Sequence, residues 1–130
     1  MTVSELITFK GETDGANTTG DFTLKSDIIY GSISYIRIPA GMKAKVWAKR
    51  ISGKPVTLKI YYTHDVTAAS PTWEEIGSEY LSAEGEKSLE KRRPIIARGL
   101  TGKEAIKFSW EQATAAESHV AIDVEFTDED

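Results

Sequence analysis

Apolar and polar residues alternate along several short stretches of this chain, which is the pattern of β-strands that bury one face. Residues 43–51 show it clearly, because Ala44, Val46 and Ala48 fall on one side and lysines and a tryptophan fall on the other. The spacing of an amphipathic helix is hardly seen. Residues 73–81 alternate poorly, and there we favour an irregular strand over a helix. The stretches predicted as strands are 5–10, 21–25, 33–38, 43–51, 56–63, 73–81, 86–91, 94–98, 106–111 and 120–127.

Segments rich in glycine, proline, asparagine and serine separate these stretches. Residues 11–21 have no large apolar side chain and are predicted to form a loop, and the alanine-rich residues 112–118 fit a connection with at most one helical turn. We expect eight or nine of these ten stretches to be strands, spaced about 10 residues apart, with some connections long enough to cross between two sheets. The pattern therefore predicts an all-β, single-domain antiparallel β-sandwich over 1–130, with jelly-roll or Greek-key connections.

Composition narrows the kind of protein. A chain of 130 residues buries enough surface for one core and is short for two domains. It contains no cysteine, so disulfides and cysteine zinc sites are excluded. The first ten residues include Glu5 and no long apolar run, so we expect neither a signal peptide nor a membrane span. No cofactor is predicted.

The net charge of −4 hides a segregated pattern. Blocks of alternating sign follow one another along the chain, and consecutive outward positions of a strand lie on one surface. Whole strand faces or loop ends should therefore carry one sign. The blocks are −3 over 1–30, +7 over 31–59, −6 over 60–86, +5 over 87–107 and −7 over 108–130.

Three interpretations of these blocks remain open. Basic strands can lie beside acidic strands within the chain, in pairs worth roughly 0.2 to 1 kcal/mol each. Faces of opposite sign can instead meet between copies and set the register of an assembly. Nucleic-acid binding is disfavoured, because the sequence pI is about 5.3 and no nucleic-acid-binding motif is present.

Trp47 stands out among the aromatic residues, because strand parity places it with Lys45 and Lys49 rather than with the apolar positions. A tryptophan there is either covered by another segment, part of a subunit interface, or a stacking platform for a sugar ring. Tyr61 is also outward by parity, and we expect it to extend the same patch. Trp73 follows a proline and fits a loop. Two other large aromatic residues alternate inward and are predicted to be core, namely Phe108 and Trp110.

The chemistry-bearing residues form no catalytic pattern. Adjacent acids such as Glu74 and Glu75 point to opposite sides of a strand, which is unsuited to paired acid–base work. His64 and His119 lie far apart in sequence and make no metal site on their own. An acidic loop with Asp14, Asn17 and Asp21 lacks EF-hand spacing, so turn formation is favoured over calcium binding.

Nucleophile and phosphate-binding motifs are also missing, so we expect a non-enzyme. The leading hypothesis is a structural protein that self-associates or decorates a larger assembly, such as a virion capsid or tail or a surface filament, through edge strands and charged faces. The alternative is a carbohydrate-binding module that uses Trp47, Tyr61 or Trp73. The residues predicted to form the interface are Lys45, Trp47, Lys49, Tyr61, Glu74, Glu75, Arg92 and Arg93.

Overall fold

The computed structural model describes residues 4–82 and 94–128 of the chain. The described residues form strands and connections and no helix, so none of their elements is a helix that could cross a membrane. All described strand pairs are antiparallel. The predicted strand at 86–91 lies outside the described residues.

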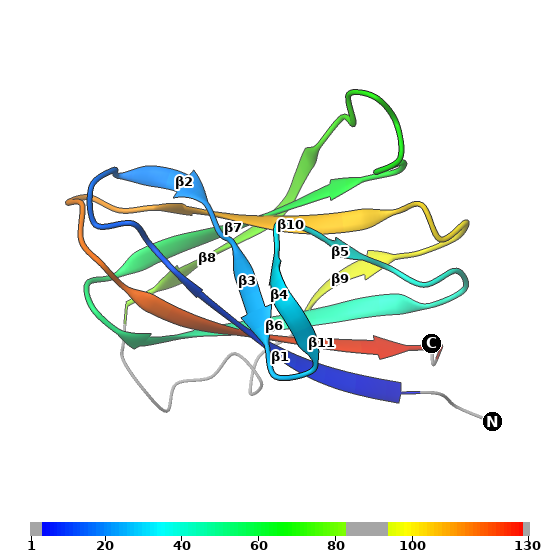
Figure 1. Ribbon diagram of the computed structural model, residues 1–130, viewed down its shortest axis with the longest axis horizontal. Coiled ribbons are helices and arrows are strands. Elements are labelled where there is room, and N and C mark those ends of the chain that lie inside the picture. Colours follow the sequence, from blue (N-terminus) through cyan, green and yellow to red (C-terminus); the bar gives the residue numbers. More distant parts are fainter. Residues whose placement is uncertain (1–3, 83–93, 129–130) are drawn as a thin grey trace.

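The described residues contain eleven strands, which make up two sheets (Figure 1). The six-stranded sheet has the order β4-β3-β1-β11-β6-β9, and the five-stranded sheet has the order β2-β10-β7-β8, with β5 also paired to β10. The strands are β1 (Ser4–Glu12), β2 (Thr19–Asp21), β3 (Leu24–Ser26), β4 (Ile29–Ile33), β5 (Ile36–Arg37), β6 (Lys43–Ser52), β7 (Val56–Thr63), β8 (Glu74–Leu81), β9 (Ile95–Arg98), β10 (Ala105–Glu111) and β11 (His119–Thr127).

The strand order is that of a jelly roll. We count residues 19–37 as one strand position. Four adjacent strands of the six-stranded sheet, β1-β11-β6-β9, are then first, eighth, third and sixth along the chain. The facing sheet then holds the second, seventh, fourth and fifth positions. Eight positions wound in this way are two Greek keys, so the predicted sandwich is confirmed.

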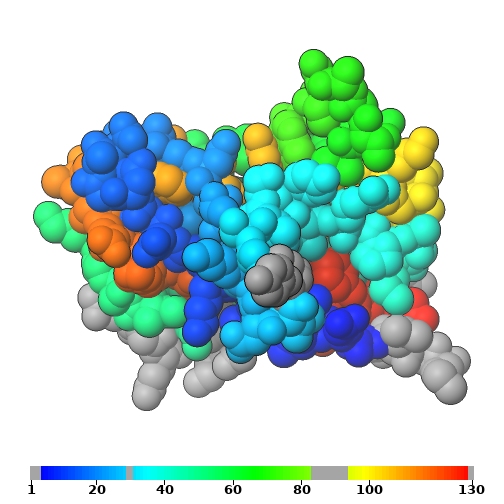
Figure 2. All heavy atoms as spheres, viewed as in Figure 1, coloured from blue at the N-terminus to red at the C-terminus, as the bar shows by residue number. Residues whose placement is uncertain are grey.

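The described residues contain more strands than the eight or nine expected, and the difference arises in residues 19–37. Strands were predicted at 21–25 and 33–38, but residues 19–37 form four short strands instead. β2 pairs with β10 in one sheet, whereas β3 pairs with β1 in the other, because the chain switches sheets between them. The prediction of a loop over 11–21 was wrong at both ends, because β1 extends through Glu12 and β2 begins at Thr19. Figure 2 shows this segment, in light blue and cyan, running across one side of the sandwich.

The core lies between the sheets and follows the predicted alternation. Val46 and Ala48 of β6 are buried, and so are Leu58 and Ile60 of β7. Phe108 and Trp110 are both core residues as predicted, at 1% and 5% exposure. Side chains at alternate positions therefore point outward, so each sheet presents an outer face.

Candidate binding surfaces on the two sheets

The outer face of the six-stranded sheet carries Lys45, Trp47 and Lys49, as parity predicts. All three side chains are half-buried, and Trp47 packs against the edge of the core. Trp47 lies directly across from Asp123 of β11 in the strand register. This tryptophan is therefore partly covered rather than displayed in full.

Charges on this face are paired within the chain. Lys45 Nζ lies 3.8 Å from Glu125 Oε1, across from it on β11. Asp123 accepts a 2.6 Å hydrogen bond from the hydroxyl of Thr8 on β1. The basic block at 31–59 thus meets the acidic block at 108–130 on neighbouring strands. This is the first of the three interpretations of the charge blocks, in which opposite charges pair within one molecule.

Tyr61 does not extend the Trp47 patch, contrary to expectation. β6 and β7 follow one another in the chain but belong to different sheets. Their outer faces point to opposite sides of the sandwich, so Trp47 and Tyr61 cannot share a surface (Figure 1). Strand parity separates inward from outward positions but does not say to which sheet a strand belongs.

A cluster of aromatic and basic side chains lies on the outer face of the five-stranded sheet instead. The Lys107 ammonium is 4.8 Å from the centre of the Trp73 ring and 5.9 Å from that of Tyr61. Both distances are within cation–π range, so Lys107 ties the two rings together. Trp73 just precedes β8, and the structure resolves it as a half-buried residue of this face.

Lys59 links three strands of the same face. Its ammonium lies 2.9 Å from Glu111 Oε1 on β10 and 3.7 Å from Glu75 Oε1 on β8. The hydrogen bond to Glu111 raises the pKa of Lys59. Beside it, the hydroxyl of Ser109 donates to Asp21 at 3.0 Å. Polar groups thus run across the sheet from β2 to β8.

Two adjacent hollows lie along these polar groups. One, of about 430 Å³, lies beside Tyr80, and the other, of about 270 Å³, lies beside Tyr61. Thr19 and Glu111 line both. Tyr80 is 62% exposed, and it was missed because the poor alternation of 73–81 left its direction undefined. The hollows together form a shallow groove with a tyrosine beside each part.

β8 forms one edge of the five-stranded sheet. It pairs with β7 through seven residues, and no strand among the described residues pairs with its other side. Ile76 is 37% exposed and has no partner in the register, which shifts at this point. Glu74 and Glu75 are both exposed, and their alternation to opposite sides agrees with the expectation. Among the described residues this edge thus has no second strand, and it carries apolar and acidic side chains.

Two of the predicted interface residues, Arg92 and Arg93, lie outside the described residues.

The acidic loop predicted around Asp14 forms a turn. The Asp14 carboxylate accepts hydrogen bonds from the backbone N–H groups of Ala16 and Asn17, both at 2.9 Å. It also accepts one from the Asn17 side chain, and these bonds lower the pKa of Asp14. Asp14 thus forms the predicted turn.

No family model and no curated protein matches the chain. One similar solved structure is that of the N-terminal CBM22-1–GH10 modules of endo-1,4-β-D-xylanase 10B from Clostridium thermocellum, complexed with xylohexaose. The TM-score is 0.48 and the identity 11%, over 95% of this chain and 25% of that one. The chain thus spans about a quarter of the xylanase structure.

Proposed function

We propose that this protein is a non-catalytic structural subunit that joins a larger assembly by pairing the open edge of β8 with a strand of another chain. The proposal rests on one observation, which is that β8 is a long edge strand without a second partner among the described residues. Its eight residues extend for roughly 26 Å. Added strands gain main-chain hydrogen bonds along such an edge and specificity from alternate side chains.

The side chains of β8 support a protein partner. Tyr80 and Ile76 are exposed apolar groups on the edge, and tyrosine is enriched at protein interfaces. Glu74, Glu75 and Glu79 make the strand acidic, with no basic residue between Glu74 and Leu81. An acidic edge discourages random pairing and favours a basic strand. The basic block at 31–59 of a second copy can face these acids by charge, whereas the added strand must come from elsewhere, because β6 and β7 already have neighbours on both sides.

The assembly proposed here is of the kind built by virion capsid, tail or decoration proteins or by surface filaments. Copies would align by charge as well as by strand pairing. Exposed charge pairs between copies weaken when salt is added, because the Debye length falls from about 10 Å at 0.1 M to about 3 Å at 1 M. The proposal therefore includes a dependence on salt.

The test measures solution mass by light scattering at low and high salt, for the wild type and for Ile76→Lys/Tyr80→Lys. We expect oligomers at low salt, a lower mass at high salt, and monomers of the double variant at both. Leu100→Lys is the matched control, because Leu100 is 75% exposed and follows β9 of the six-stranded sheet. A wild type that is monomeric at both salts, or a double variant with unchanged mass, contradicts the proposal.

The groove on the five-stranded sheet favours a second candidate, carbohydrate binding. Tyr61 and Tyr80 flank two hollows lined by hydroxyl, carboxylate and ammonium groups, which suit stacking and hydrogen bonding to sugar rings. Affinity electrophoresis through gels that contain a polysaccharide tests this second candidate, with the variants Tyr61→Ala and Tyr80→Ala. Trp47→Ala is the control on the opposite sheet, and we expect it to leave retention unchanged. Equal retention of all three variants would contradict glycan binding in this groove.

A further inference from the structure

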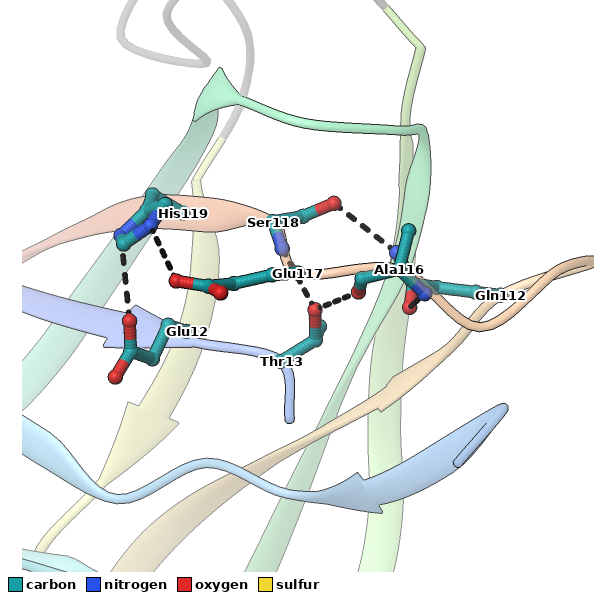
Figure 3. A network of polar contacts seen from close by, with 7 residues as sticks. All are labelled: Glu12, Thr13, Gln112, Ala116, Glu117, Ser118 and His119. Atoms are coloured by element: carbon teal, nitrogen blue, oxygen red, sulfur yellow. Dashed lines mark hydrogen bonds and ion pairs between the residues drawn. The ribbon is translucent and has the colours of Figure 1, made fainter. Parts of the chain in front are cut away.

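Two carboxylates and an imidazole meet where β1 ends and β11 begins. Glu12 is the last residue of β1 and lies directly opposite His119, the first residue of β11. Glu117 precedes His119 by two positions and turns toward the same ring (Figure 3). Residues more than a hundred positions apart in the chain are thus placed together by the strand register.

Their spacing suits ligands of one ion. Glu12 Oε2 lies 3.6 Å from His119 Nδ1, and Glu117 Oε1 lies 3.3 Å from His119 Nε2. One donor atom from each of the three residues lies within 4.8 Å of the others. Ligands about 2.0–2.1 Å from a tetrahedral zinc ion are separated by about 3.3 Å. The two carboxylates face different ring nitrogens, so binding one ion requires side-chain rotations that bring both to the same nitrogen, and all three side chains are exposed.

The backbone beneath the cluster is fixed by a buried polar network. Thr13 and Ser118, at 1% and 0% exposure, exchange two bonds: the Thr13 N–H donates to Ser118 O at 2.9 Å, and the Ser118 N–H donates to Thr13 Oγ1 at 2.8 Å. Gln112 donates to the Ser118 hydroxyl at 3.1 Å and accepts from the Ala116 N–H at 3.3 Å. The Ser118 hydroxyl donates to Lys54 O at 2.8 Å. Each of the three ionisable residues is next to a member of this network, which positions it in advance.

The cluster also borders an acidic hollow. This hollow, of about 620 Å³, is lined by Glu12, Glu117, Asp14 and Asp21. Four carboxylates around one hollow, against the single cation Lys25, lower the electrostatic energy of a bound cation.

We propose that Glu12, Glu117 and His119 bind one divalent transition-metal ion, of the zinc class, with water in the remaining position. Imidazole nitrogen with carboxylate oxygen is a donor set for zinc and similar ions, whereas calcium takes oxygen ligands. An ion here joins the end of β1 to the start of β11. Binding to the folded state alone stabilises that state by mass action. None of the three ligands lies on β8 or lines the groove, so the site does not depend on the proposed function.

Isothermal titration of zinc chloride into chelator-treated, dialysed protein tests the site. We expect one ion per chain, at least tenfold weaker binding in His119→Ala and in Glu117→Gln, and a higher melting temperature for the wild type with zinc. His64→Ala and Glu5→Gln are matched controls, because they remove the other histidine and another exposed β1 carboxylate. Both should bind zinc as the wild type does.

Nitrogen-15 NMR of the imidazole rings gives a second readout that does not depend on variants. Zinc should shift the ring nitrogen signals of His119 and leave those of His64 in place. The proposal is overturned if the wild type shows no saturable binding, if His119→Ala or Glu117→Gln binds as tightly as the wild type, or if His64 shifts in place of His119. Melting curves of both variants without metal show whether they are folded.

Discussion

Gly20 of β2 lies against the indole of Trp110 so closely that a Cβ at position 20 would fall 2.4 Å from two ring carbons. The ring also packs on Phe22, with centroids 5.1 Å apart. Trp110 thus fills the space beneath β2, and the short strand crosses it only because residue 20 has no side chain. The pairing of β2 with β10 depends on this contact.

We therefore expect Gly20→Ala to lower the free energy of unfolding by about 2 kcal/mol, because overpacking a core displaces the ring or the strand. Urea denaturation followed by tryptophan fluorescence measures the loss. Thr19→Ala, at the exposed neighbouring position of β2, is the control and should change stability by less than about 0.5 kcal/mol. Equal effects of the two variants would mean that the contact is unimportant.

Glu104 should make the protein sensitive to acid. Burial alone would raise the pKa of this carboxyl, but hydrogen bonds from its own backbone N–H, from those of Thr101 and Leu100 and from the Thr101 hydroxyl outweigh it and hold the pKa at about 2. The ordinary value is 4.5. The stabilisation is therefore complete above about pH 4.5 and is lost as the pH falls from there through about 2.

Chemical denaturation at several pH values between these limits tests this. Wild-type stability should fall steeply with decreasing pH, whereas that of Glu104→Gln should be lower at neutral pH and fall less. Parallel pH profiles of the two proteins would show that Glu104 is not the group responsible.

Thr13 is expected to be essential to the buried network below β1 and β11. Thr13→Val keeps the shape but leaves the Ser118 N–H and the Ala116 carbonyl without their hydroxyl partner. We expect a loss of about 2 kcal/mol in unfolding free energy. Thr8→Val is the matched control, because its hydroxyl bonds to Asp123 in an exposed position. A control loss as large as that of Thr13→Val would argue against a special role of burial.

Arg50 should hold the end of β8 in place. Its guanidinium is 5% exposed and donates to the carbonyls of Leu81 at 3.1 Å, Ser82 at 2.6 Å and Gly53. Arg50→Met removes these bonds and should cost about 3 kcal/mol. Arg50→Lys should recover only part of this, because an ammonium cannot reproduce the planar fork. Hydrogen exchange of the β8 amides measures the local effect. Full recovery of wild-type stability by Arg50→Lys would contradict the role of the planar guanidinium.

The regular strands were predictable because their alternation reflects burial directly. Val46 and Ala48, or Phe108 and Trp110, face inward wherever the chain keeps a period of two. Residues 73–81 were ambiguous for a physical reason that the register now supplies: Ile76 is an unpaired residue at a register shift, so the alternation breaks there.

The candidate surfaces were less predictable. Charge blocks indicated opposite signs on neighbouring strands, and Lys45 with Glu125 shows such a pair. Parity could not reveal that Trp47 and Tyr61 belong to different sheets, since that depends on where the chain crosses between them. The meeting of Glu12 with His119 depends on a register over a separation of more than a hundred residues, which no local pattern carries.

The pairing of β1 with β11 along nine residues also bears on how the protein is made. β11 lies between β1 and β6 in its sheet, so both of those strands lack one neighbour until β11 has left the ribosome. The native six-stranded sheet should therefore form only after residue 127 has emerged. Nascent chains stalled before residue 119 should accordingly remain open to protease, with β1 and β6 exposed to chaperones.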